Sequence, residues 1–520
     1  MSDTTSTPVP PAVVPTAVPL RGIAPEDRIP LRQKIVFALG TDMDILSNNL
    51  TFSILWLPIF NIGMGMNAIL LSGILVALRL FDAFADPVMG NISDNTNTRW
   101  GRRRPFIALG TIAMVLVYPL FWHLPSGWGD AARAVALVAI GILFLVAYTL
   151  WAMPYYGLQL ELTPSYDERT RLAAWCSIFA KFGYLAIGWA IAFILLIGML
   201  ASGDASVLEG RSDFVRGLLE FIQPLVTWLS DAQPGEKPLV VGMRSVCWLV
   251  GGLMLVCGLL PAIFVKERYH KVAAKRPKKT PFLVSLKESF HCKPLWQLIG
   301  MTFFLLIGSA FITGLNYYVN AYYACQGDLL LGGKIAGIKA VVVSVTGLLS
   351  IPVLTKLSER FDKRAVAISM LTLTVVGHLA NYILMTPAHP YWQIYTGLTE
   401  AIAIPAIWMF MPSMKADVAD WDEFHTSRRR EGSLNSFYSW FVKAAITVSV
   451  VFKGAALEWS GFNPKLPAQS DGVVHRMFML YLLLPIGFWL TSIVFAWFYP
   501  ISRRAAAETR SALEARRGKA

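Results

Sequence analysis

Long apolar runs separated by short polar segments repeat along almost the whole chain. A helix of about 20 apolar residues crosses the hydrocarbon core of a bilayer, and the chain holds twelve runs of about that length or more. The pattern therefore predicts an all-α membrane protein with twelve transmembrane helices. The expected spans lie at about 34–60, 66–92, 105–125, 131–157, 172–200, 238–265, 294–323, 332–357, 364–387, 391–417, 434–458 and 474–499.

The polar segments divide the chain into two halves of six spans each. The loop after the second span, NISDNTNTRWGRRR, is echoed after the eighth by KLSERFDKR, and two related six-helix bundles are a transporter architecture. The expected parts are a disordered cytoplasmic leader at 1–30, an N-terminal six-helix bundle at 31–265, an insertion at 201–236 within it, a cytoplasmic central loop at 266–293, a C-terminal six-helix bundle at 294–500 and a basic cytoplasmic tail at 501–520.

The insertion has two interpretations that the sequence leaves open. Its segment FVRGLLEFIQPLVTWL is amphipathic, so it could lie on the outer membrane surface. It could equally be a loose loop.

Charge is sparse and follows the rules of membrane topology. Only 15% of the 520 residues are charged, 55% are hydrophobic, and the net charge is +13. The basic residues gather in the loops after even-numbered spans and in the tail, which places both termini in the cytoplasm. We therefore expect a multi-pass protein of the plasma (inner) membrane, in contact with the lipid bilayer, and no nucleic-acid binding.

The cysteines and the lone histidine of the ninth span point to no metal chemistry. The chain has five cysteines, none in a CxxC pair, which indicates reduced packing residues. His378 has no second histidine at metal spacing and is expected to be a packed side chain. We expect no cofactor and no metal beyond a coupling Na⁺.

Two carboxylates lie four residues apart inside the second span. Asp82 and Asp86 share one helical face, and a single acid at the bilayer centre costs about 3 kcal/mol. The pair is tolerable if it faces a wet cavity, shares a proton or holds a cation. The alternative is an ion pair with Arg79, one turn earlier.

Other polar and aromatic side chains within the spans are candidate contacts for a polar substrate. Asn316 in the seventh span could hydrogen-bond a polyol or simply join helices, and Trp408 in the tenth could stack on a sugar ring or pack. Lys181 and Lys443 are lone charges in apolar runs and need a partner or water. In the fourth span, Tyr148 and Thr149 lie just before Pro154 and could offer oxygens to a ligand or simply pack at a kink. Asp42, near the first third of the first span, could line a cavity or rest near the interface, whereas Asp44 is expected to be locally paired.

Three long motifs resemble one family of carriers. DAFADPVMGNISDNTNTRWGRRRPFIALG is similar to the second-to-third span signature of the glycoside–pentoside–hexuronide:cation symporters, the melibiose-carrier-like branch of the major facilitator superfamily. MPYYGLQLELTPSYDERTRL and ADVADWDEFHTSRRREG, the latter followed by FVKAA, resemble two further motifs of that family. The resemblance covers about 31–500 and implies a major facilitator fold with cation-coupled uptake of a small polar glycoside.

Site residues carry over from the resemblance position by position. It implies a cation site of Asp82, Asp86 and Thr149, a sugar-contacting acid at Asp42, an aromatic near the sugar at Tyr156, and a span 11 lysine at Lys443. Four positions depart from the melibiose carrier: Thr41, Ala85, Ala152 and Ser177. The cation site is therefore mostly kept and the sugar site is altered. Residues expected in gating cytoplasmic loops are Asp94, Arg102, Arg103, Arg104, Asp417, Asp420 and Arg429.

The sequence thus predicts a secondary active transporter and no enzyme. We expect a monomer that couples Na⁺ or H⁺ to symport of a sugar or glycoside by alternating access, because a bound cation relieves the repulsion between the paired acids. Two alternatives stay open at this point. One is a carrier of an amphipathic, lipid-like substrate, and the other is an intramembrane prenyltransferase that uses the acidic series Asp82, Asp86 and Asp94 to hold Mg²⁺ and a diphosphate.

Overall fold

Helices account for nearly all of the chain that the structure, a computed structural model, describes. The described residues are 28–96, 98–125, 127–163, 166–210, 212–233, 235–267, 292–426, 431–466 and 468–517. Most of the expected leader and most of the expected central loop lie outside them.

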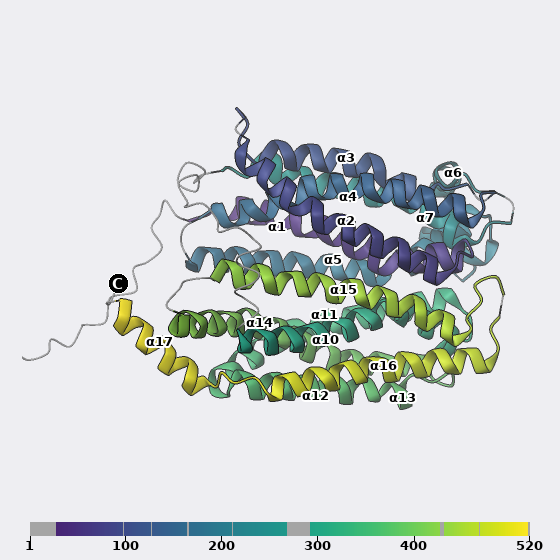
Figure 1. The fold of residues 1–520 in the computed structure, drawn as a ribbon. Helices are drawn as coiled ribbons and strands as arrows, with labels where there is room; N and C mark the ends of the chain where they lie inside the picture. Colours follow the sequence, from purple (N-terminus) through teal and green to yellow (C-terminus); the bar gives the residue numbers. More distant parts are fainter. Residues whose placement is uncertain are drawn as a thin grey trace, which may run out of the picture.

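The N-terminal bundle packs its helices mainly against one another (Figure 1): α3 lies on α4 and α7, and α1 lies on α5 and α7. Its first span begins as an α-helix and continues as two π-helical segments, η2 and η3. The elements are α1 (Leu31–Asp44), η2 (Ile45–Leu55), η3 (Pro58–Gly63), α2 (Ala68–Asn95), α3 (Arg104–Trp122), α4 (Asp130–Glu161), α5 (Tyr166–Ala201) and α7 (Pro238–Phe264).

The C-terminal bundle forms the other half of the molecule (Figure 1), with α10 packed on α15 and α16 and with α12 on α14. The last helix, α17, lies at one end of the molecule and packs on α14. The elements are α10 (Lys293–Val319), η5 (Asn320–Ala324), α11 (Leu329–Arg360), α12 (Lys363–Leu379), α13 (Asn381–Leu384), η6 (Pro390–Tyr395), α14 (Thr396–Thr426), α15 (Glu431–Ser460), α16 (Asp471–Trp497) and α17 (Arg503–Arg517).

Ten spans of the described chain are long and apolar enough to cross a membrane. The two other expected spans are also helical. The first is divided among α1, η2 and η3 and carries Asp42 and Asp44, and the tenth is α14, several of whose side chains lie outside the described set. The expectation of an all-α protein with two six-helix bundles is confirmed.

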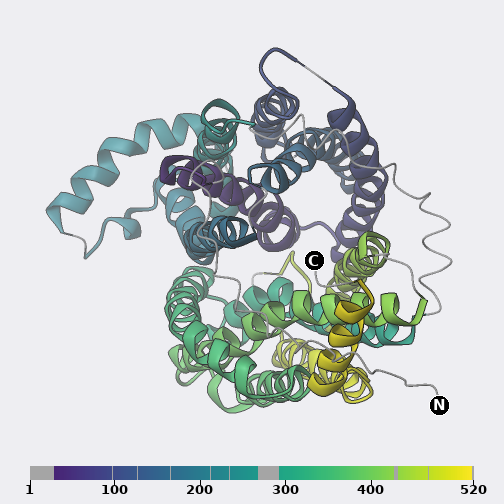
Figure 2. The same ribbon diagram turned by 90° about the vertical axis from the view of Figure 1, so that its left-hand side faces the viewer.

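The two bundles meet mainly along two pairs of helices, α5 with α11 and α2 with α15, and α10 also contacts η2. An end-on view shows the N-terminal and C-terminal bundles as two groups of helices (Figure 2). Small residues allow close approach, since a Cβ on Gly333 of α11 would lie 2.8 Å from the backbone nitrogen of Ala192 on α5. Polar contacts also cross at the end opposite α17, where Tyr318 Oη donates to Asn61 Oδ1 at 2.9 Å.

The insertion contains a helix of its own, α6 (Asp213–Ser230), so the loose-loop interpretation is wrong for these residues. Helix α6 lies at the end opposite α17 and projects sideways from the N-terminal bundle (Figures 1 and 2). Leu219 packs it against Leu200 of α5 and Val207 of the preceding turn. A neighbouring face exposes large apolar side chains, namely Phe214, Leu218, Phe221, Leu225 and Trp228.

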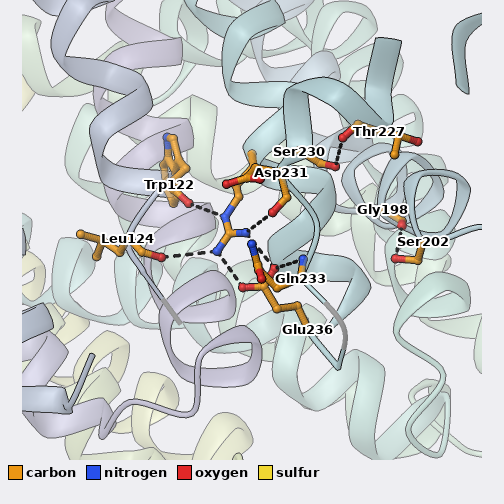
Figure 3. A network of polar contacts seen from close by, with 10 residues as sticks. Trp122, Leu124, Gly198, Ser202, Thr227, Ser230, Asp231, Gln233 and Glu236 are labelled. Atoms are coloured by element: carbon orange, nitrogen blue, oxygen red, sulfur yellow. Dashed lines mark hydrogen bonds and ion pairs between the residues drawn. The ribbon is translucent and has the colours of Figure 1, made fainter. Parts of the chain in front are cut away.

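One buried arginine fastens the loop that follows α6. Both terminal nitrogens of Arg244, on α7, donate to the carboxylate of Glu236, at 2.7 and 2.8 Å. Figure 3 shows Glu236 and the backbone carbonyls of Trp122, Leu124 and Asp231 converging on this guanidinium. Such a bidentate pair, with further carbonyl acceptors, satisfies a charge that burial would otherwise penalise.

Candidate functional site

The acid pair of the second span lies where α2 of the N-terminal bundle meets α15 of the C-terminal bundle. Lys443 of α15 places its Nζ 3.9 Å from Asp82 Oδ2 and forms a second, closer ion pair with Asp86 Oδ2. Thr149 Oγ1, from α4, donates to Asp86 Oδ1 at 3.3 Å. The three predicted cation-site residues therefore come together, and Lys443, predicted as a substrate contact, joins them.

The expected alternative partner of these acids is engaged elsewhere. Arg79 Nη2 donates to Asn48 Oδ1 at 2.8 Å, and its guanidinium lies over the ring of Phe52. Among the residues that the structure describes, the ion-pair partner of both acids is Lys443. The hypothesis that Arg79 neutralises the pair by a direct ion pair is therefore wrong for this structure.

The side chains at this site are of the kind that can bind a monovalent cation. Asp82, Asp86 and Thr149 present oxygen atoms, the ligands that hard cations prefer, and both carboxylates are largely buried. An ammonium now lies among them, but the side chain of Lys443 remains 48% exposed. The ammonium is thus held by charge while the rest of the side chain stays partly accessible.

A second polar network links the first, second and fourth spans of the N-terminal bundle. Tyr148 Oη donates to Asp44 Oδ1 at 2.6 Å, and Asn48 Nδ2 donates to Tyr148 Oη at 3.4 Å. Arg79 completes the chain through Asn48, and Tyr156 lies close enough to interact with Asp44 as well. Tyr148 and Tyr156 were predicted, but Asp44 was interpreted as locally paired. The sequence signal for Asp44 was the presence of a second acid only two residues after Asp42 within the same span.

Two further predicted substrate contacts, Asp42 and Lys181, lie where α5 packs against α1 and against α11. Asp42 of α1 packs so closely on Gly183 of α5 that a Cβ there would lie 2.6 Å from its Oδ1. Lys181, also on α5, reaches toward Gly347 of α11, in the C-terminal bundle. The structure therefore does not bring Lys181 to the acid pair on α2.

The remaining predicted substrate contacts are less informative. Asn316 Oδ1 accepts a hydrogen bond from Tyr481 Oη at 3.0 Å, which joins α10 to α16 within the C-terminal bundle. This contact is the helix-joining role that the sequence left open. The side chain of Trp408 lies outside the described residues.

The arginine-rich loop after α2 is fastened by a carboxylate that the sequence analysis did not single out. The backbone N–H groups of Arg102, Arg103 and Arg104 donate to Glu267, just after α7, at 2.8, 2.8 and 3.0 Å. Gly101 turns the chain there with φ +120, a conformation that favours glycine. The available signal for Glu267 was its place in the polar segment that follows the sixth span.

Three other predicted loop residues lie on helices near their ends, Asp94 on α2 and Asp417 and Asp420 on α14. Asp417 Oδ2 pairs with Lys363 Nζ at 2.6 Å, which links α14 to α12. Asp420 also lies on α14. The side chain of Asp94, on α2, and the whole of Arg429 fall outside the described residues.

Glu168, at the start of α5 and outside its apolar span, anchors the beginning of α1. Lys34 Nζ pairs with Glu168 Oε1 at 2.6 Å, and the Ile29 N–H donates to the same oxygen at 2.9 Å. Burial acts to raise the pKa of Glu168, but these bonds outweigh it and hold the pKa below its ordinary value.

Lys453, in the α15 run VSVVFKGAALEW, is a charged residue that was not predicted as functional from the sequence. Its side chain is buried, and the structure gives it no hydrogen bond or ion pair among the described residues. The signal was the same as for Lys443, a single charge inside an apolar run.

Comparison with known proteins identifies a family of transporters. The family described as "MFS/sugar transport protein" matches residues 43–503. The chain is 22% identical to the glucuronide carrier protein homolog of Escherichia coli, over 89% of this chain and 92% of that protein. It is 23% identical to sodium-dependent lysophosphatidylcholine symporter 1 of Mus musculus, over 86% of this chain and 81% of that protein.

Solved structures show the same fold. An inward-facing bacterial homolog of the human lysosomal transporter Spinster matches with a TM-score of 0.58 at 15% identity, and the match covers 94% of this chain and 98% of that one.

Proposed function

Since this chain belongs to the MFS/sugar transport protein family, we propose that it couples Na⁺ or H⁺ to the symport of a sugar or glycoside by alternating access. Membership of this transporter family excludes the prenyltransferase alternative. One observation carries the coupling proposal: the Lys443 ammonium, from one bundle, pairs with Asp82 and Asp86 of the other.

Coupling follows from competition for one site. Without a bound cation, the ammonium of Lys443 neutralises part of the charge of the acid pair and ties α15 to α2. An arriving Na⁺ or proton takes over that neutralisation and frees the amine. The contact between the bundles then changes with cation binding, so the cation alters the equilibrium between the two orientations of the carrier.

The sugar or glycoside is the first candidate for the substrate. The family description and the relative named a glucuronide carrier homolog support it. The relative named a lysophosphatidylcholine symporter favours an amphipathic lipid as the second candidate. The Lys/Arg bias of the loops supports insertion in the plasma (inner) membrane with both termini in the cytoplasm.

The test measures accumulation by the purified full chain in proteoliposomes. Radiolabelled glycosides, glucuronides and lysophospholipids are offered in turn under an imposed Na⁺ gradient and then under an imposed H⁺ gradient. We expect Asp86→Asn to insert and fold normally but to lose gradient-driven accumulation, because the site no longer needs a cation to neutralise it. The matched control is Asp130→Asn, which removes a carboxylate at the start of α4.

Two results would contradict the proposal. One is full gradient-driven accumulation by Asp86→Asn. The other is wild-type uptake that follows the substrate gradient alone and responds to neither ion.

A further inference from the structure

Lys453 of α15 is a lysine inside the membrane that no acid of the described residues neutralises. The residue is 6% exposed, and the structure gives its ammonium no hydrogen bond or ion pair with any residue that it describes. Gly314 of α10 packs directly on the side chain, since a Cβ there would lie 2.7 Å from Cε and 3.0 Å from Nζ. The lysine is therefore held between helices and is not folded out toward the lipid.

Comparison with Lys339 shows that this situation is unusual within the same chain. Lys339 is about as buried, at 8%, but its Nζ pairs with Glu400 Oε1 at 2.8 Å. A buried charge without a partner costs several kcal/mol, so a protein normally supplies one. Lys339 has such a partner, whereas none of the residues that the structure describes provides one for Lys453.

A second cation, from the opposite bundle, lies near Lys453. Gly454, the residue after Lys453, packs against Ser72 of α2, since a Cβ there would overlap Ser72 Oγ. Arg79 lies two turns further along α2, and its positive charge acts on the lysine. It donates to the neutral oxygen of Asn48, and a guanidinium has further N–H donors to offer. The contact of α2 with α15 therefore brings together two like charges that repel each other.

The charge of Arg79 also acts on two acids, Asp44 and Asp82, but both are engaged with other partners. Tyr148 donates to Asp44, and Lys443 pairs with Asp82 and Asp86. No carboxylate of the described residues forms an ion pair with either Arg79 or Lys453. A negative group supplied from outside the protein would relieve the repulsion and satisfy both cations at once.

We propose that Arg79 and Lys453 form the binding site for an oxyanion, a carboxylate or a phosphate, carried by the transported substrate. This inference rests on the proposed function, because it takes the ligand to be the substrate of the symporter. The two cations belong to different bundles, so a bound anion bridges the bundles. Substrate binding at this site thus opposes separation of the two bundles where α2 meets α15. The coupling cation acts elsewhere on the same helices, at the acid pair of Asp82 and Asp86.

The test uses two pairs of probes that differ only in the charged group. Methyl glucuronide and methyl glucoside differ in a carboxylate, and lysophosphatidate and monoacylglycerol differ in a phosphate. Affinity for the purified full chain in nanodiscs is measured for wild type, Lys453→Met and Lys453→Arg. Lys465→Met serves as the control, because Lys465 is exposed in the loop before α16.

We expect wild type to bind the charged member of one pair more tightly, and that pair identifies carboxylate or phosphate as the ligand. Lys453→Met should reduce this preference by roughly tenfold, whereas Lys453→Arg and Lys465→Met should keep it. Loss of an unpaired buried charge should also raise the unfolding temperature of ligand-free Lys453→Met, which shows that the variant folds. An unchanged preference in Lys453→Met, or no preference in wild type for either charged probe, would overturn the inference.

The inference and the proposed function can fail separately. If the anion preference is absent but Asp86→Asn still abolishes gradient-driven accumulation, the symporter remains and only the anion site is lost. If the preference is present but uptake responds to neither ion, the site remains and the coupling proposal is lost.

Discussion

Lys443 and Lys453 are on the same helix, yet their surroundings differ completely. Lys443 is half-exposed and pairs with two acids, so its charge is partly solvated and partly neutralised. Lys453 is buried and has no ion pair among the described residues. At the scale of the residue, the charge partner of each lysine decides its role, and burial decides how much that partner matters.

Removal of the Lys443 charge should strengthen cation binding. Lys443→Met removes the ammonium that occupies the acid pair, so we expect the affinity for the coupling ion to rise by roughly tenfold, or about 1.4 kcal/mol. The measurement is a titration of uptake with Na⁺ and with pH in proteoliposomes. A lower ion affinity in this variant would show that the amine helps to build the site and does not compete for it.

Glu168 should make the stability of the protein depend on pH. Its pKa in the folded protein is lowered, so its stabilising contribution is present above the unfolded value, about 4.3, and is lost as pH falls through the folded value. At pH 7 we expect Glu168→Gln to destabilise by about 3–5 kcal/mol, because Lys34 loses its buried partner.

The check compares the thermal unfolding midpoints of wild type and Glu168→Gln between pH 7 and pH 3. The gap between them should narrow below about pH 4. Glu220→Gln, on the exposed surface of α6, is the control and should show no such gap. A gap that stays constant with pH would contradict the assignment.

At the scale of the element, the first span and α6 depart most from a simple apolar helix. The first span changes from α-helix to π-helix at Ile45, directly after Asp42 and Asp44. Wide π-helical turns occur frequently at functional sites. Helix α6 instead has two apolar faces, one packed on α5 and one exposed as a stripe of aromatic and aliphatic side chains.

We expect the exposed stripe of α6 to lie in the interface of the outer leaflet, where aromatic and apolar side chains enter and polar ones stay in water. A cysteine-free chain labelled with an environment-sensitive fluorophore at Phe221→Cys should show blue-shifted emission that brominated lipids quench. The same label at Glu220→Cys is the control and should remain in water. Equal quenching at both positions, or at neither, would contradict this placement.

At the scale of the whole molecule, two six-helix bundles meet along α5 with α11 and α2 with α15. The hydrogen bond from Tyr318 to Asn61 crosses between the bundles at the end opposite α17. The acid pair of Asp82 and Asp86 and the proposed oxyanion site of Arg79 and Lys453 both lie where α2 meets α15. A site shared between bundles is what allows the binding of a ligand to alter their relative orientation.

The orientation of the molecule in the membrane is testable with fusions. Basic loops after even-numbered spans predict a cytoplasmic C-terminus, so a green fluorescent protein fused after Ala520 should fluoresce in a bacterial host. Alkaline phosphatase at the same position should be inactive, because it folds only outside the cytoplasm. Active phosphatase would reverse the assigned topology.

The sequence by itself determined the class of fold. The helical spans, the two halves and the acid pair at Asp82 and Asp86 follow from hydropathy and helical spacing, which are properties of neighbouring residues. The family also follows from the sequence alone, because each of its three motifs is a continuous run of residues.

Only the tertiary structure decided which charges meet. Lys443 is 357 residues from Asp86, and no local rule favours it over Arg79, which lies one turn away. The same holds for Glu267 beneath the arginine loop and for Lys453 beside Arg79. The partner of a buried charge depends on which helices pack together, because an ion pair inside a membrane forms only between side chains that packing has already brought close.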